Sequence, residues 1–401
     1  MDSESRVTNG ESVSMVDQST RLSKHRGTYV QNVPGKPVSI ELQRAFVNSA
    51  HFVVGVETEA PLIVIKDEQV LENGQALIEL ARLFNNNELP AYADALDINP
   101  DHEMWAISID SSIEVGRNLQ GRGSPIEIKS PALKTGKVDY KELFRKMWRI
   151  IEPKKVAHIE YWKMANNNIH FSLEGRERFP LAWAQRLAFC IVYFERAIDS
   201  IIPGMTHTTD TTRPGGWKHC NRYTKRNRVV PRIVGKPMDD LHSCWAWIRR
   251  VESIEELHDL ICHDNDEWRR TNGLTHKNWK WNFKGLNWRT IEFRHMPPTR
   301  NAQESIDWID FTTEFVRAAG RVDSGRLDAA HDGKMTFREA LDLPVVHTTD
   351  TTQRSELIWA GDHNLWEADW LELLQFMGNQ EFWARLLVVR NKLEMELEKL
   401  G

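Results

Sequence analysis

Short runs in which apolar and polar residues alternate recur along the chain from residue 52 onward. Alternation with a period of two is typical of strands that bury one face. The pattern predicts strands at residues 52–65, 104–109, 125–129, 156–161, 169–173 and 290–294.

Between these runs, apolar residues recur every three or four positions, which is the spacing of a helix with one buried side. The spacing predicts helices at residues 74–84, 140–151, 181–202, 254–261 and 305–320. Ser305 is the expected N-cap of the last one and Gly320 its end. After a polar connection at 321–354, we expect helices at 366–376 and 381–400. Together these elements predict an α+β fold.

The domain organisation follows from a change in composition near residue 46. The preceding residues are polar and rich in Ser, Thr and Asn, so residues 1–45 are predicted to be a disordered N-terminal tail. Residues 46–320 are predicted to be the main folded domain. Residues 321–401 are predicted to be a linker and a C-terminal helical extension.

Charge and composition narrow the class of protein. The 401 residues carry 52 Lys and Arg against 57 Asp and Glu, a formal net charge of -5, which argues against a dedicated nucleic-acid binder. The most apolar run, 187–194, is too short to span a membrane. The N-terminus has no apolar signal region and the four cysteines form no CxxC motif. We therefore expect a soluble cytoplasmic protein that binds neither nucleic acid nor membrane, and a homo-oligomer is compatible with the sequence.

Carboxylates gather on the polar faces of the predicted strands. Glu57 and Glu59 are two positions apart, so both point to one face, and Glu127, His170 and Glu292 alternate with apolar residues in other strands. A solvated face is the ordinary explanation for one such strand. Across four strands a metal site is favoured, because carboxylates fit β-structure poorly and repel one another without bridging cations. Oxygen ligands with one imidazole suit Mg²⁺ or Mn²⁺.

Taken in order, five short motifs resemble the amidoligase family, whose relatives include glutamine synthetase and the glutamate–cysteine ligases. The motifs are Gly55-Val56-Glu57-Thr58-Glu59, Trp105 to Asp110-Ser111-Ser112, Glu127-Ile128-Lys129-Ser130-Pro131-Ala132-Leu133, Asn168-Ile169-His170 and Thr290-Ile291-Glu292-Phe293-Arg294. The resemblance spans residues 52–320. It implies a glutamine-synthetase-like antiparallel sheet with a polar concave face and helices on the other side, and it makes residues 46–320 the catalytic domain.

The resemblance implies an ATP-dependent carboxylate–amine ligase that uses Mg²⁺ or Mn²⁺ and acts on a small-molecule carboxylate and an amine in a biosynthetic pathway. Arg294 would contact the transferred phosphoryl group or the carboxylate substrate. The family's usual His-x-His strand has Asn168 in place of its first histidine. The implied metal ligands are Glu57, Glu59, Glu127, His170 and Glu292.

Such a ligase activates the acid as an acyl phosphate and needs a base to take a proton from the attacking amine. Asp110 is the candidate base, and a turn residue in Asp110-Ser111-Ser112 is the alternative. Eight basic residues and no acid lie between Asp210 and Asp239, which predicts either a nucleotide-binding loop with Arg222 and Lys225 as contacts or a solvated loop.

The resemblance points to Asn282 as a further cofactor contact, and Ser130 is another candidate. Trp279, Trp281 and Trp288 would line a substrate pocket or belong to the core. Three other functions fit part of the pattern: a phosphotransferase of the guanidino-kinase type, a metal-dependent hydrolase, and a non-catalytic module that binds nucleic acid or another ligand. The segment His-Thr-Thr-Asp-Thr-Thr occurs at 207–212 and again at 347–352 without an assignable role.

Overall fold

The computed structural model describes residues 40–94, 103–111, 113, 123–151, 156–158, 166–175, 179–201, 241–262, 280–283, 285, 289–296, 299, 301–343 and 370–378. Contacts between residues divide the chain into two units, Met1–Ser39 and Ile40–Gly401, and all the described residues belong to the second. Helix α1 (Ile40–Ser49) begins inside the stretch that was predicted to be a tail up to residue 45. The predicted helix at 381–400, both repeated segments and the basic loop lie outside the described residues.

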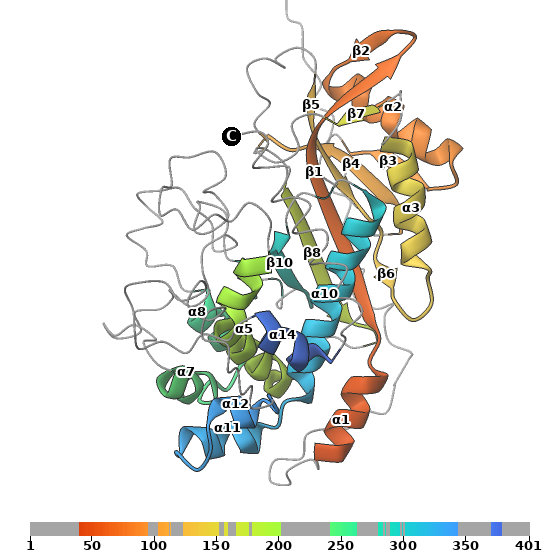
Figure 1. Ribbon diagram of the computed structural model, residues 1–401. Coiled ribbons are helices and arrows are strands. Elements are labelled where there is room, and N and C mark those ends of the chain that lie inside the picture. Colours follow the sequence, from red (N-terminus) through yellow and green to blue (C-terminus); the bar gives the residue numbers. More distant parts are fainter. Residues whose placement is uncertain are drawn as a thin grey trace, which may run out of the picture. The chain divides into compact units, whose positions relative to one another are not determined.

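A sheet of ten strands organises the described part of the chain (Figure 1). Seven strands run in the order β3-β4-β5-β1-β8-β10-β9, and β2, β6 and β7 also pair with β1. All pairs are antiparallel except β3 with β4. The α+β class and the mostly antiparallel sheet are therefore confirmed. The strands are β1 (Phe52–Lys66), β2 (Gln69–Leu71), β3 (Ala91–Ala93), β4 (Trp105–Ile109), β5 (Ser124–Lys129), β6 (Leu133–Lys134), β7 (Val156–His158), β8 (Asn166–Leu173), β9 (Trp281–Asn282) and β10 (Ile291–Met296).

Strand β1 lies at the centre of this sheet, between β5 and β8, and its register sets the positions of the polar residues. Glu57 lies opposite Lys129 on one side and Asn168 on the other. On the next strand pair, His170 lies opposite Glu292. Residues that face one another across a sheet point to the same side. The polar positions of β5, β1, β8 and β10 therefore share one face.

The opposite face is apolar and packs against helices. On this face Trp105 of β4 makes edge contacts with Phe84 and Phe144, each with ring centroids 5.7 Å apart. Phe293 and Trp281 pack on aromatic residues of α10. The helices after α1 are α2 (Asn73–Asn86), α3 (Tyr140–Ile151), α5 (Leu181–Ile201), α7 (Leu241–Ile248), α8 (Ile254–Ile261), α10 (Ala302–Arg321), α11 (Ser324–His331), α12 (Phe337–Ala340) and α14 (Trp370–Met377).

Two sequence predictions about the C-terminal part were wrong. Helix α10 is capped by Asn301, whose side chain accepts a hydrogen bond from Glu304 N, and the predicted cap Ser305 instead accepts one from Trp148 Nε1 inside the core. The polar connection expected at 321–354 contains α11 and α12, and α12 opens with a capping box. The helices after residue 320 pack on α5, α7 and α10 within the same unit. Among the described residues, no helix is both long and apolar enough to cross a bilayer.

Candidate functional site

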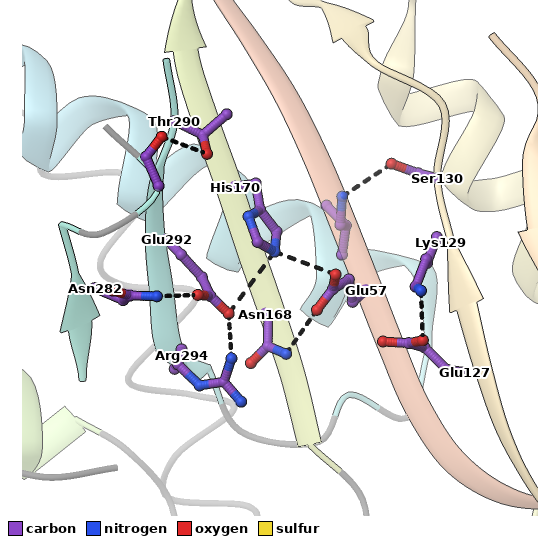
Figure 2. A network of polar contacts seen from close by, with 12 residues as sticks. Glu57, Glu127, Lys129, Ser130, Asn168, His170, Asn282, Thr290, Glu292 and Arg294 are labelled. Atoms are coloured by element: carbon purple, nitrogen blue, oxygen red, sulfur yellow. Dashed lines mark hydrogen bonds and ion pairs between the residues drawn. The ribbon is translucent and has the colours of Figure 1, made fainter. Parts of the chain in front are cut away.

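Five side chains that the sequence suggested as metal ligands converge on the polar face of the sheet. Figure 2 shows Glu57, Glu127, His170 and Glu292 among them. The five side chains form two trios, and within each trio the potential ligand atoms all lie within 4.8 Å of one another. Glu57 belongs to both. The histidine trio consists of Glu57, His170 and Glu292, and the carboxylate trio consists of Glu57, Glu59 and Glu127.

His170 stands between two carboxylates of the histidine trio. Its Nε2 lies 3.3 Å from Glu57 Oε1 and 3.7 Å from Glu292 Oε1, and this buried nitrogen lies outside regular hydrogen-bond geometry. Burial lowers the pKa of His170, but the attraction of Glu57 and Glu292 outweighs it and raises the pKa to about 9. Without a metal, the imidazole therefore carries a positive charge at neutral pH, which offsets part of the negative charge of the trio.

Asn168 links the two trios. Its Nδ2 donates to Glu57 Oε2 at 2.8 Å and to Glu59 Oε1 at 2.9 Å. Glu57 Oε1 faces His170, whereas Glu57 Oε2 accepts the hydrogen bond from Asn168, so the two oxygens of Glu57 point toward different trios. The Asn168 amide thus acts as a clamp on two carboxylates.

The outer strands of the site, β5 and β10, each carry a positively charged residue two positions after the glutamate. On β5, Lys129 Nζ lies 2.9 Å from Glu127 Oε2, which also accepts a hydrogen bond from Ser108 Oγ at 3.1 Å. On β10, Arg294 donates to Glu292 Oε1, and Asn282 of β9 donates to Glu292 Oε2 at 2.7 Å. Figure 2 shows these pairs on either side of Glu57.

Most carboxylates of the cluster are buried, which argues against a solvated strand face, and Glu57 is partly exposed. Glu59, Glu127 and Glu292 are at most 9% exposed. Burial and the repulsion of neighbouring carboxylates raise the pKa of Glu59 to about 8 and that of Glu127 to about 7. Burial also opposes ionisation of Glu57, but His170, Asn168 and Arg294 lower its pKa below the usual range. The negative charge of the cluster thus exceeds what its positively charged side chains, Lys129, His170 and Arg294, stabilise.

The pH dependence of stability should report this excess charge. Because the folded-state pKa of Glu59 lies above its unfolded value, the metal-free protein loses stability as pH rises from about 4.5 to about 8. We expect Glu59→Gln to stabilise the metal-free protein by roughly 3 kcal/mol at pH 7 and by nearly nothing at pH 4, since one pKa unit is worth about 1.4 kcal/mol. Urea denaturation in the presence of a chelator measures both values.

Glu79→Gln is the matched control for this pH series. Glu79 is equally buried, but its hydrogen bond with Arg82 lowers its pKa to about 2, so its loss should destabilise the protein at neutral pH. A Glu59→Gln variant that is less stable than the wild type at pH 7 would show that Glu59 is ionised and already compensated.

The donor set fits a hard divalent cation. Atoms bound to one Mg²⁺ at about 2.1 Å lie at most about 4.2 Å apart, so small side-chain rotations would close either trio around an ion. Carboxylate oxygens with one imidazole are the ligands that Mg²⁺ and Mn²⁺ accept. The buried Nε2 of His170, aimed between two carboxylates outside regular hydrogen-bond geometry, also fits an ion at the histidine trio.

The remaining predicted site residues differ in where they lie relative to the cluster. Asn282 faces the cluster through its bond to Glu292, whereas Trp281 is buried in the core against Phe293. Asp110 directly follows β4, and its charge contributes, after burial, Glu57 and Glu127, to the raised pKa of Glu59. Ser130 accepts a hydrogen bond from Val56 N at 2.9 Å and donates to Pro131 O. The outlying candidates Arg222, Lys225, Trp279 and Trp288 fall outside the described residues.

Ser130 is expected to hold strand β1 in place and not a cofactor. Its hydroxyl accepts from Val56 N, and its own N–H donates to Val56 O, where β5 has ended. Ser130→Ala should therefore cost about 1–2 kcal/mol of stability by leaving a buried N–H unbonded. Urea denaturation measures this loss. A stable variant with weakened nucleotide binding would instead support the cofactor role predicted from the sequence.

Sequence reasoning missed two side chains of the site, Lys129 and Ser108. The alternation in Glu127-Ile128-Lys129 placed Lys129 on the polar face, and this was the available signal. Ser108 alternates with apolar residues of β4 and faces Glu127 across the strand pair. Its contact depends on which strand lies beside β4, which the sequence does not show.

Comparison with known proteins adds no relative for this chain. A scan against models of protein families and a search of curated proteins both find no match. The assignment of function therefore depends on the geometry of the cluster and on the motifs that form it.

Proposed function

We propose that this protein is an ATP-dependent carboxylate–amine ligase whose nucleotide and acid meet over the polar face of a glutamine-synthetase-like sheet. The observation that carries the proposal is the convergence of five motif residues into two trios that share Glu57, with Arg294 beside Glu292. A divalent cation held there, Mg²⁺ or Mn²⁺, would neutralise phosphate charge and align the reacting groups.

The reaction makes distinct demands on the protein's own residues. A carboxylate oxygen of the acid attacks the γ-phosphorus of ATP and ADP leaves; the amine then attacks the acyl carbon of the acyl phosphate and phosphate leaves. Arg294 supplies a guanidinium that binds phosphoryl or carboxylate oxygens in a fixed planar geometry. Its ion pair with Glu292 holds it at the edge of the cluster.

The amine must lose a proton before or during its attack, and a carboxylate near the sheet has to accept it. Asp110 remains the candidate. It directly follows β4, close enough for its charge to act on Glu59. The metal-facing carboxylates serve this role poorly, because a bound cation would keep their electron pairs engaged.

The test is release of ADP and phosphate in the presence of Mg²⁺, with pooled carboxylic acids and with or without pooled amines. We expect release that needs both pools and that is absent from Glu292→Gln. Glu79→Gln is the control, because it removes an equally buried carboxylate from α2, outside the cluster.

Other outcomes separate the alternatives. ADP release that needs no second substrate class and leaves a stable phosphorylated acceptor would make the protein a phosphotransferase. Absence of Mg-nucleotide binding in calorimetry would overturn both the ligase and the phosphotransferase. Tight, steeply salt-dependent binding of oligonucleotides would favour the binding module instead.

A further inference from the structure

Behind the site, α5 and the two strands at the β9 edge share a buried ionic network. Lys280 lies immediately before β9, and its side chain is 1% exposed. Its Nζ contacts a carboxylate oxygen of Asp199 and lies 3.9 Å from Glu195 Oε1, both on α5. His295 Nδ1 of β10 lies 3.4 Å from the same Asp199 oxygen. Asp199 thus contacts Lys280, which precedes β9, and His295, which lies on β10.

Strand β10 is irregular at the point where this network touches it. Phe293 pairs with Ile169 of β8, but the next recorded pair is Met296 with Asn167, so the register shifts between them. Two residues of β10, Arg294 and His295, therefore oppose the single residue Asn168, which is the arrangement of a β-bulge. Bulges re-aim side chains and leave part of the ladder without its regular bonds.

The residues of the bulge are held from two directions. Arg294 N donates to Lys280 O at 2.8 Å, while the Arg294 guanidinium reaches Glu292 on the polar face. His295 turns the other way, toward Asp199 on the helical side. Lys280 thus bonds Arg294 through its main chain and Asp199 through its side chain.

We propose that Asp199 is a positioning residue for Arg294: through Lys280 and His295 it fixes the bulge that presents the guanidinium to the anionic groups of the substrates. The role of Arg294 toward those groups rests on the proposed function, whereas its placement by Asp199 does not. Asp199 itself lies on the helical side of the sheet and acts through its neighbours.

The placement can be tested without any ligand. Arg294 Nε is buried and makes no hydrogen bond within the described structure, so its N–H should exchange slowly and give a separate NMR signal in ¹⁵N-arginine-labelled protein. Its absence in Arg294→Lys assigns the signal. We expect Asp199→Asn to shift or broaden it. Asp310→Asn, which removes a carboxylate that contacts Tyr140 and Lys141 on the helical side, should leave it unchanged.

Binding of Mg-ATP provides the second readout, as a double-mutant cycle. Asp199→Asn should weaken Mg-ATP binding about tenfold to a hundredfold, as loss of supporting partners does in other sites. In an Arg294→Lys background it should have less than about a twofold further effect, because the group that it positions is already gone.

The outcomes are distinct. An unchanged Arg294 signal in Asp199→Asn would overturn the positioning role. The same loss of Mg-ATP affinity in the wild-type and Arg294→Lys backgrounds would also overturn it and would indicate general destabilisation. If the wild-type protein binds no Mg-ATP, the proposed ligase function falls, and the NMR comparison still decides whether Asp199 places Arg294.

Discussion

Glu57→Gln is expected to weaken divalent-metal binding at least a hundredfold and to abolish ligase turnover. Glu57 is the carboxylate shared by both trios, with one oxygen toward His170 and the other held by Asn168. Its replacement removes a ligand and a negative charge from both positions at once. Loss of partners outside the first ligand sphere already costs 10–100-fold in known sites, so loss of a shared ligand should exceed that.

Titration with Mn²⁺, followed by electron paramagnetic resonance of the free ion, measures the effect directly. Glu174→Gln is a suitable control, because Glu174 directly follows β8 and pairs with Lys137. Equal Mn²⁺ affinity in wild type and Glu57→Gln would contradict the assignment of the trios as metal ligands. Glu127→Gln should affect only the ion at the carboxylate trio.

Lys280→Met is expected to have the largest effect on stability among the substitutions considered, a loss of about 3–5 kcal/mol. Its ammonium is buried between Asp199 and Glu195, which are themselves no more than 5% exposed. Removing one member of a buried ionic network leaves the other charges uncompensated, and this costs several kcal/mol even where the intact network contributes little.

Denaturation with guanidinium chloride measures this loss, and Lys66→Met is the matched control. Lys66 also pairs with a buried carboxylate, Glu79, but is half exposed, so its removal should change stability by less than about 1 kcal/mol. Adding Asp199→Asn to Lys280→Met should recover part of the lost stability. A loss below 1 kcal/mol for Lys280→Met alone would show that the buried carboxylates do not depend on the Lys280 ammonium for charge compensation.

The sequence predicts the regular elements well where the apolar pattern is strong. The long alternation of β1 and the helical spacing of α3 and α8 give the observed bounds to within a residue. Short edge elements are missed, because β2 and β9 have three and two residues and are fixed by their neighbours. Residues 40–45 of α1 were predicted to belong to the tail, because this helix is held by tertiary contacts near its end, such as those of Arg317 with Val47 O and Ala50 O.

For the candidate site too, the sequence predicts what depends on the local pattern and misses what depends on tertiary contacts. Alternation alone places Glu57, Glu127 and Glu292 on the polar faces of their strands. It does not give strand order or register, and these decide that β1 lies between β5 and β8 and that Glu57 is the shared carboxylate. The Asn168 clamp and the bulge at Arg294 depend on the same register, so they had no signal in the sequence beyond an unexpected asparagine.

The measurement that tests the central claim most directly is electron–nuclear double resonance on Mn²⁺ bound with a non-hydrolysable ATP analogue. It requires no knowledge of the acid or the amine. We expect nitrogen coupling from His170, lost in His170→Gln, together with phosphorus coupling from the nucleotide on protein-bound manganese. Manganese that shows phosphorus coupling without nitrogen coupling, or that does not bind with the nucleotide at all, would contradict it.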